Sequence, residues 1–251
     1  VTPLYSSIWN RHSPRKLEWW MNLPMGAKRF QPEIWTLEPY PNLTVYFVHA
    51  PKYFDRDGLY GDTHAAYVDN GERYVGFSKA VVHLARYLPL RPEVVHVHDW
   101  QTGLVPLLIR HEVAQGGWTE KPRTVLTIHN LAYQGIFPKP VYAMSNLPEE
   151  YFHPGGAEFY KSVNFLKAAV VYSDALTTVS PRYAREITTL EYGEHLDGVI
   201  RSRRDTLRGI LNGVDYDEWK TIGNPYLPAP YGVDDLEGKA RTKAALQVEM
   251  G

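Results

Sequence analysis

With 251 residues and 44% hydrophobic content, the chain is long enough for one large domain or two small ones with a substantial core. Its 27 Lys and Arg balance 28 Asp and Glu, and a net charge of -1 gives no global field for nucleic acid or an anionic membrane. The lack of cysteine excludes disulfides and thiolate metal sites, and no signal peptide or membrane-spanning run is expected. We expect a cytoplasmic protein without nucleic-acid or membrane partners.

Aromatic side chains make up 13% of the chain, with 18 Tyr and 7 Trp. Such rings stack on the apolar C–H faces of sugars, so the composition suits carbohydrate binding. Packing in the core is the alternative explanation for any single ring.

The first 69 residues show little periodicity. Residues 1–5 resemble the end of a strand, and residues 8–38, rich in Trp, Pro and basic side chains, predict mostly loop with short strands. Residues 42–50 predict a strand, and the Asp-, Gly- and Tyr-rich residues 51–69 predict an irregular loop.

The next segment predicts two strand–helix–strand units in series. Apolar residues recur at helical spacing over 72–87, and a second helix is expected over 102–114. Short β-branched runs over 94–100 and 124–130 end abruptly in polar residues, as buried parallel strands do. This order predicts an α/β fold whose parallel strands are joined by right-handed crossovers.

Beyond residue 130 the chain alternates between turn-rich and regular segments. Residues 131–156 are too long for a simple connection and predict a functional surface or a lid. Ser180 before Pro181 predicts the N-cap and first position of a helix that runs through Arg185. The other expected elements are helices over 158–172 and 237–250 and strands over 175–179 and 207–211.

His98 and Asp99 end the first of the two β-branched runs. Adjacent strand residues face opposite ways unless the strand has bent, so we expect only one of them to enter a given pocket. A carboxylate there could bind sugar hydroxyls, orient a neighbour or act as a base. Capping of the following helix is the alternative role for Asp99.

His129 and Asn130 end the second run. An imidazole and an amide offer both donors and acceptors, which suits the recognition of hydroxyl groups, although a histidine bonded to backbone is the alternative. The carboxyl ends of parallel strands open onto a common crevice, which is therefore the predicted site. The ten histidines show no recognised ligand spacing, so no metal is expected.

Several familiar motifs are absent from the sequence. There is no G-x-G-x-x-G or Walker loop, so the bare sequence carries no nucleotide signature, and there is no G-x-S-x-G nucleophile motif. Asn212 to Asp215 predicts either a simple tight turn or the point where the chain leaves for a second domain.

Four motifs together carry a resemblance to a known family. They are His-Val-His-Asp-Trp-Gln-Thr-Gly-Leu at 96–104, Thr-Ile-His-Asn-Leu-Ala-Tyr-Gln-Gly at 127–135, Thr-Thr-Val-Ser-Pro-Arg-Tyr-Ala-Arg-Glu-Ile at 177–187 and Leu-Asn-Gly-Val-Asp at 211–215. In content, order and spacing they resemble bacterial glycogen synthases and plant starch synthases. Tyr-Val-Asp-Asn at 67–70 and Phe-Leu-Lys-Ala at 165–168 also match, so the resemblance covers nearly the whole chain.

The resemblance implies the N-terminal, Rossmann-like domain of a GT-B architecture. That family transfers glucose from ADP-glucose to the non-reducing end of an α-1,4-glucan with retention, so the implied partners are a nucleotide-sugar donor and a glucan acceptor, without a further cofactor.

The resemblance also assigns roles residue by residue. His129 would contact the donor glucose and present its backbone carbonyl near the anomeric centre, and Asp99 would line the cleft. Asn212 would lie near the donor. The implied substrate-binding residues also include Asn130, His98 and, as a weaker candidate for the cleft wall, Tyr67.

Two departures from the family pattern concern the ends of the chain. The family's Lys-x-Gly-Gly-Leu loop and its second Rossmann domain are not in this sequence. We expect residues 1–215 to form the acceptor-side domain without its first strand–loop–helix unit, and residues 216–251 to begin the connection to the donor domain. Such a piece alone should be inactive.

Two other functions remain open. One is a related GT-B transferase that uses UDP-glucose or another acceptor, and the other is a non-catalytic glucan-binding module. The expected location is the cytoplasm, or the plastid if the source is a plant.

Overall fold

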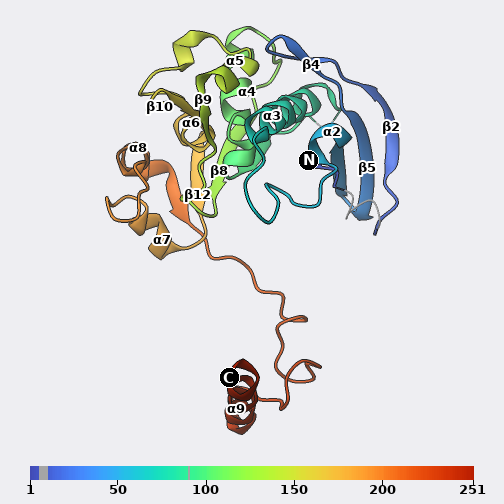
Figure 1. Cartoon of the computed structure of the whole chain (residues 1–251), viewed down its shortest axis with the longest axis vertical. Coiled ribbons are helices and arrows are strands. Elements are labelled where there is room, and N and C mark those ends of the chain that lie inside the picture. Colours follow the sequence, from blue (N-terminus) through green and yellow to red (C-terminus); the bar gives the residue numbers. More distant parts are fainter. Residues whose placement is uncertain (6–10, 90) are drawn as a thin grey trace. The chain divides into compact units, whose positions relative to one another are not determined.

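The computed structural model describes residues 1–5, 11–89 and 91–251. The chain divides into two compact units, Val1–Ile210 and Leu211–Gly251 (Figure 1). The second unit consists of a largely irregular segment followed by helix α9, Glu237–Met250, at the predicted position. The first unit contains the sheets described below.

A parallel sheet forms the centre of the first unit. Its strands are β7 (Val94–His98), β8 (Arg123–Ile128), β12 (Ala175–Thr178) and β13 (Leu207–Gly209), in the order β13-β12-β8-β7. All three neighbouring pairs are parallel. The predicted α/β fold with a parallel sheet is therefore confirmed.

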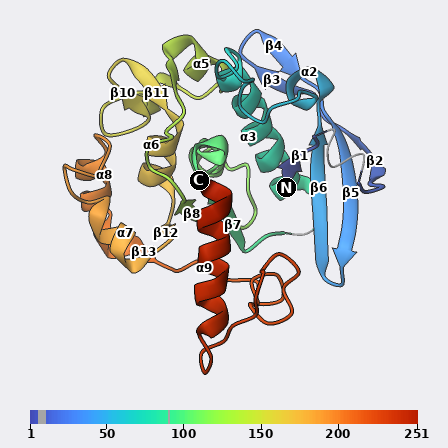
Figure 2. The ribbon, with the colours of Figure 1, turned by 60° about the horizontal axis from the view of Figure 1, so that its bottom comes forward.

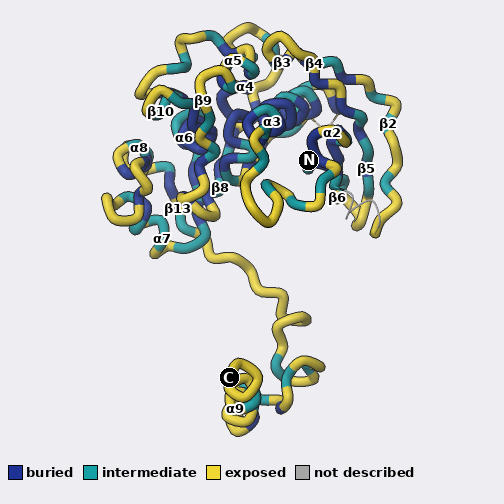
Figure 3. The backbone as a smooth tube through the Cα atoms, in the orientation of Figure 1, coloured by how far each residue is buried: buried dark blue, intermediate teal, exposed yellow. Residues whose placement is uncertain are grey.

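Helices flank this sheet and bury its apolar residues. They are α3 (Asn70–Tyr87), α4 (Val105–Ala114), α6 (Phe165–Tyr172), α7 (Pro181–Glu186) and α8 (Asp197–Ser202). In Figure 3 the deepest burial runs along α3, α4 and the strands beside them. The predicted N-cap is confirmed, because the Ser180 side chain accepts a hydrogen bond from the Tyr183 N–H.

A second sheet lies on the opposite side of α3 from strand β12 (Figure 2). Its order is β1-β6-β5-β2, with β1 (Thr2–Pro3), β6 (Leu43–His49), β5 (Glu33–Tyr40) and β2 (Arg15–Trp20). Strands β3 (Leu23–Met25) and β4 (Lys28–Phe30) pair as a separate antiparallel hairpin.

The expectation of mostly loop over residues 8–38 is therefore wrong for the described part of that range. The β5 burial pattern alternates over Glu33–Leu37, but the short strands and the interrupting Pro residues hid this period-two signal. Residues 8–10 of the expected loop lie outside the described residues.

The expected helix over 158–172 is also wrong in its first half. Residues Glu158–Phe159 (β10) and Ser162–Asn164 (β11) form a hairpin, and β11 also pairs with β9, Ile136–Pro138. Tyr160 and Lys161 form the turn with φ of 48° and 67°, which no helix allows. The Asn164 side chain then caps α6 by accepting from the Lys167 N–H.

Short helices occupy the remaining connections: α2 (Pro51–Phe54), η1 (Trp100–Thr102), α5 (Lys139–Met144), η2 (Glu149–Tyr151) and η3 (Arg204–Thr206). The predicted long connection over 131–156 is thus partly ordered by β9, α5 and η2. In the part of the chain that is described, no helix is long and apolar enough to cross a membrane.

Candidate active site

The carboxyl ends of β7 and β8 bring the predicted polar residues together. The two strands are in parallel register with His98 opposite Thr127. The Asp99 carboxylate accepts a hydrogen bond at 2.7 Å from the His129 backbone N–H, and the Asp99 N–H donates to the Thr127 carbonyl at 3.0 Å. The predicted crevice edge is therefore a hydrogen-bonded unit.

Backbone geometry at Asp99 makes this arrangement possible. Its φ of 51° and ψ of -165° lie in a region that favours glycine, and the chain turns sharply there. The chain has bent at Asp99, which is the exception allowed for in the expectation that only one of His98 and Asp99 would enter a given pocket, and both side chains contact His129, one at its ring and the other at its backbone N–H. The capping alternative is also wrong, since the Asp99 side chain makes no capping hydrogen bond to η1.

Three imidazoles form a row beside this carboxylate. His98 Nδ1 lies 3.0 Å from His129 Nε2, and the ring centroids of His96 and His98 are 4.4 Å apart. His96 Nε2 lies 2.7 Å from the Thr127 hydroxyl oxygen. Sequence reasoning did not select His96, although its two-residue spacing from His98 places both on one face of β7.

The environment of His96 and His98 favours the neutral form of both rings. Desolvation by the surrounding protein lowers the pKa of the His96 and His98 imidazoles below the ordinary value, and the neighbouring imidazoles lower it further. A neutral imidazole has one donor and one acceptor nitrogen, so each ring can donate on one side while it accepts on the other. The His98–His129 contact can therefore pair the donor nitrogen of one ring with the acceptor nitrogen of the other.

Asn130 shapes the loop that follows β8. Its side-chain oxygen accepts a hydrogen bond from the Ala132 N–H at 3.0 Å, and the residue is exposed. The next backbone N–H, that of Leu131, donates to the Tyr183 hydroxyl at 3.0 Å. These two bonds fix the chain directly after His129.

Tyr67 lies in the loop before α3. Its hydroxyl accepts from the Gly58 N–H at 3.2 Å, and its ring lies 4.6 Å from the Arg56 guanidinium. None of its described hydrogen bonds or ring contacts involves His98, Asp99 or His129. Asn212 belongs to the second compact unit, where it is exposed.

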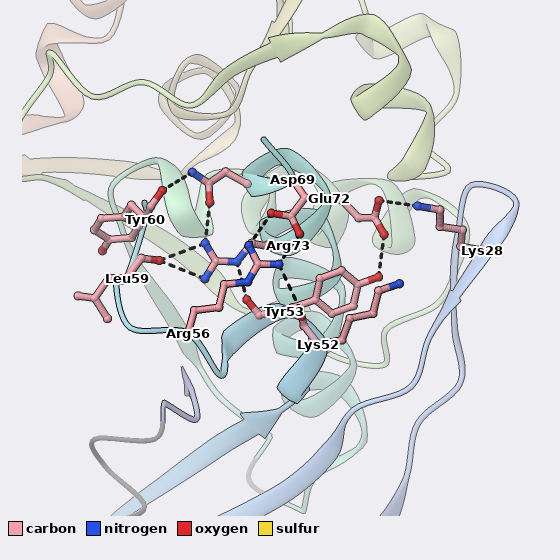
Figure 4. Close-up of polar contacts among 10 residues, drawn as sticks. Lys28, Lys52, Tyr53, Arg56, Leu59, Tyr60, Asp69, Glu72 and Arg73 are labelled. Carbon is pink, nitrogen blue, oxygen red and sulfur yellow. Dashed lines mark hydrogen bonds and ion pairs between the residues drawn. The ribbon is translucent and has the colours of Figure 1, made fainter. Parts of the chain in front are cut away.

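A buried arginine anchors the loop that contains Tyr67 (Figure 4). The Arg73 guanidinium donates to the Tyr53 carbonyl at 2.7 Å, to the Asn70 side chain at 2.6 Å and to the Leu59 carbonyl at 3.1 Å. Asn70 in turn donates to the Tyr60 carbonyl at 2.8 Å. The Tyr60 ring centroid lies 6.1 Å from that of Trp100, the residue after Asp99.

A cavity of about 440 Å³ opens beside Trp100. Its lining includes Trp100, Tyr133, Phe159, Glu194 and His195. Sequence reasoning missed the residue that builds this wall. Buried Gln134 donates to the Glu194 carbonyl at 2.8 Å and accepts from Asn164 at 2.6 Å, joining the β8 loop to the Glu194 turn.

Aromatic faces next to acidic and imidazole groups suit a polyhydroxylated ligand in this cavity. Within the described residues, no group of three or more His, Asp or Glu side chains is placed to hold a metal ion.

These features define a Rossmann-like α/β domain with its polar site at the carboxyl edge of the parallel sheet. Residues 1–202 match the family described as the starch synthase catalytic domain. The chain therefore belongs to that family, and its fold is that of the GT-B starch synthase catalytic domain.

Individual relatives agree with this assignment. A glycogen synthase of Anaeromyxobacter sp. (strain Fw109-5) is 50% identical over 208 residues, which are 82% of this chain and 44% of that protein. One from Syntrophotalea carbinolica is 41% identical over 254 residues, covering 100% of this chain and 52% of that protein. The chain thus spans about half the length of the curated relatives it matches.

A solved structure is also similar. It is the catalytic domain of starch synthase IV from Arabidopsis thaliana bound to ADP and acarbose, with a TM-score of 0.76 and 31% sequence identity. The match covers 96% of this chain and 49% of that chain.

Proposed function

We propose that the protein containing this chain is a glycosyltransferase that moves glucose from ADP-glucose to the non-reducing end of an α-1,4-glucan, with retention of configuration. Family membership supports the reaction class, and the ADP in the Arabidopsis structure favours an adenine nucleotide donor. The observation that carries the proposal is the joint engagement of His129 by Asp99 and His98 at the carboxyl edge of the sheet.

In this proposal His129 contacts the transferred glucose, and its backbone carbonyl faces the anomeric centre. The Asp99 carboxylate orients the His129 backbone through the 2.7 Å hydrogen bond, while His98 fixes the His129 ring. Asn130 is proposed to contact the donor side of the site, and Tyr67 remains the weaker candidate for a wall residue.

The chemistry proposed for these groups needs no carboxylate nucleophile. The Asp99 oxygen nearest His129 already accepts a backbone N–H, which suits a positioning carboxylate rather than an attacking one. Retention then favours departure of the nucleotide and attack by the glucan on the same face of the sugar. A preorganised carbonyl dipole stabilises the oxocarbenium-like centre during this exchange.

The glucan acceptor is proposed to enter along the cavity beside Trp100. Tyr133 is 67% exposed there and offers a ring face, while Glu194 and His195 supply hydrogen-bonding groups. The donor is a substrate, and no further cofactor is proposed. A cytoplasmic location fits this role.

A direct assay tests the proposal. The full-length protein should incorporate glucose into glycogen from radiolabelled ADP-glucose, and the 251-residue chain alone should not, because half of the relatives' length is outside it. Faster transfer from UDP-glucose than from ADP-glucose would show that UDP-glucose, and not ADP-glucose, is the donor. Glucan binding without transfer from either donor by the full-length protein would favour the binding-module alternative.

A further inference from the structure

A second polar cavity lies at the opposite end of the parallel sheet. It measures about 240 Å³, and its lining includes Arg110, Lys121, Thr124, Asp174 and Arg203. Thr124 is near the start of β8, whereas His129 follows the end of that strand. Five residues of extended chain place the two sites roughly 16 Å apart.

The charged and hydroxyl side chains of this cavity come from segments that lie far apart in the sequence. Arg110 belongs to α4, which packs against α6 (Figure 1). Lys121 and Thr124 flank the start of β8, and Asp174 directly precedes β12. Arg203 follows α8. The geometry is therefore set by the packed core of the unit and not by one mobile loop.

Positive charge exceeds negative charge in the lining. Asp174 is its one carboxylate among the described residues, and Thr124 already satisfies Oδ2 through its backbone N–H at 2.7 Å and its hydroxyl at 2.9 Å. The other oxygen, Oδ1, lies 3.7 Å from Lys121 Nζ and 3.6 Å from an Arg123 nitrogen. Asp174 is thus shared between Lys121 and Arg123, and it does not form a salt bridge with either arginine of the cavity lining.

Neither arginine of the lining forms a salt bridge with a carboxylate within the described residues. The Arg110 guanidinium lies 5.7 Å from the Tyr172 ring centroid, so an aromatic face is its described contact. Arg203 donates to the Val171 carbonyl at 2.7 Å and to the Ser173 carbonyl at 2.6 Å, which neutralises no charge. Burial lowers the pKa of Arg203, and the attraction of the nearby Asp174 offsets this lowering only in part.

A buried hydroxyl in the lining also lacks a partner. Ser173 is 3% exposed, and its Oγ has no hydrogen-bond partner among the described residues. A buried polar group of this kind usually bonds to a ligand, an ion or an ordered water. Guanidinium and ammonium groups around such a polar hollow are the set that binds phosphate oxygens in proteins.

We propose that this cavity is an anion site that binds the phosphate group of a small phosphorylated metabolite. Arg110, which forms no ion pair among the described residues, and Lys121, which shares Asp174 with Arg123, supply the positive charge. Arg203 and Ser173 form the floor. The site is separate from the proposed transfer site, so it does not depend on the identity of the donor sugar.

Inorganic phosphate titrated into the ¹⁵N-labelled 251-residue chain tests this proposal, with sodium chloride holding the ionic strength constant. Saturable shifts are expected at the amides of Thr124, Ser173 and Asp174. Arg110→Gln should weaken binding by about tenfold or more, because a charge-assisted hydrogen bond is lost. Arg204→Gln is the matched control. This substitution removes the same charge, but the Arg204 side chain is 76% exposed and lies outside the cavity lining.

Lys121→Gln provides a second variant in case Arg110→Gln does not fold, and it should also weaken binding. The proposal would be overturned by shifts that do not saturate or that spread over the surface. It would also be overturned if Arg110→Gln and Lys121→Gln bound phosphate as strongly as the parent chain. Because no nucleotide sugar is present, failure here leaves the glucosyl-transfer proposal to its own assay.

Discussion

The Asp99 carboxylate holds the backbone N–H of His129 at 2.7 Å across the carboxyl ends of two neighbouring parallel strands. Asp99 does so from a backbone conformation with φ of 51° and ψ of -165°, which costs on the order of 1 to 3 kcal/mol for a residue other than glycine. The hydrogen bond to His129 therefore requires a strained backbone at Asp99. Substitutions at Asp99 should separate the effect of this strain on stability from the effect of the bond on glucosyl transfer.

Asp99→Gly and Asp99→Ala separate them. Both lose the bond to His129, but glycine relieves the backbone strain, so the Gly variant should be more stable than the Ala variant by about 1 kcal/mol. Urea unfolding of the 251-residue chain measures this difference. Glucosyl transfer by the full-length protein should fall strongly in both. Equal stability of the two variants would show that the backbone at Asp99 is unstrained.

Gly135 should not tolerate a side chain. It has φ of 62°, and an added Cβ would lie 2.5 Å from Cε3 of Trp100. Gly135→Ala should therefore cost about 3 kcal/mol in unfolding free energy and alter Trp fluorescence. Gly116→Ala is the control, because Gly116 has φ of 72° but nothing within 4 Å. A similar loss in both variants would mean that backbone conformation alone matters.

The sequence predicts those features of this structure that depend on residues close together in the chain. Strand-length β-branched runs predicted β7 and β8, and helical spacing predicted α3, because these are local patterns. The turn at Tyr160 and Lys161 was missed, since neither residue type favours positive φ. The joint contact of His98 and Asp99 with His129 was likewise missed, because it depends on one unusual backbone conformation and on the register of two strands.

Arg73 should be required as arginine. Its planar fork reaches three separate acceptors in a fully buried position, and a lysine ammonium cannot match that geometry. Arg73→Lys should lower the unfolding free energy by about 3 kcal/mol and expose residues 55–69 to limited proteolysis. Arg56→Lys, at a partly exposed ion pair with Asp69, should cost less than about 1 kcal/mol. Equal proteolysis of the two variants would contradict the anchoring role of Arg73.

Stability should depend on pH through the histidine row. The folded state lowers the pKa of His96 and of His98 below the ordinary value of 6.5, so the unfolded chain binds more protons in that range. The contribution of these rings is fully present above about pH 7 and is lost as the pH falls through 6.5. Urea unfolding at pH 7.5 and 5.5 should show a smaller difference in His96→Gln/His98→Gln than in the parent chain. If the double variant and the parent chain showed the same difference in stability between the two pH values, groups other than His96 and His98 would cause the pH dependence.

The most direct test of the central claim is the turnover of the full-length protein with His129→Ala. Transfer of radiolabelled glucose from ADP-glucose to glycogen should fall by about two orders of magnitude or more, as for the loss of a group that acts on the transition state. His153→Ala, which alters a histidine outside the site, should retain activity. A His129→Ala protein that is folded and transfers glucose at the parent rate would contradict the assignment of the active site.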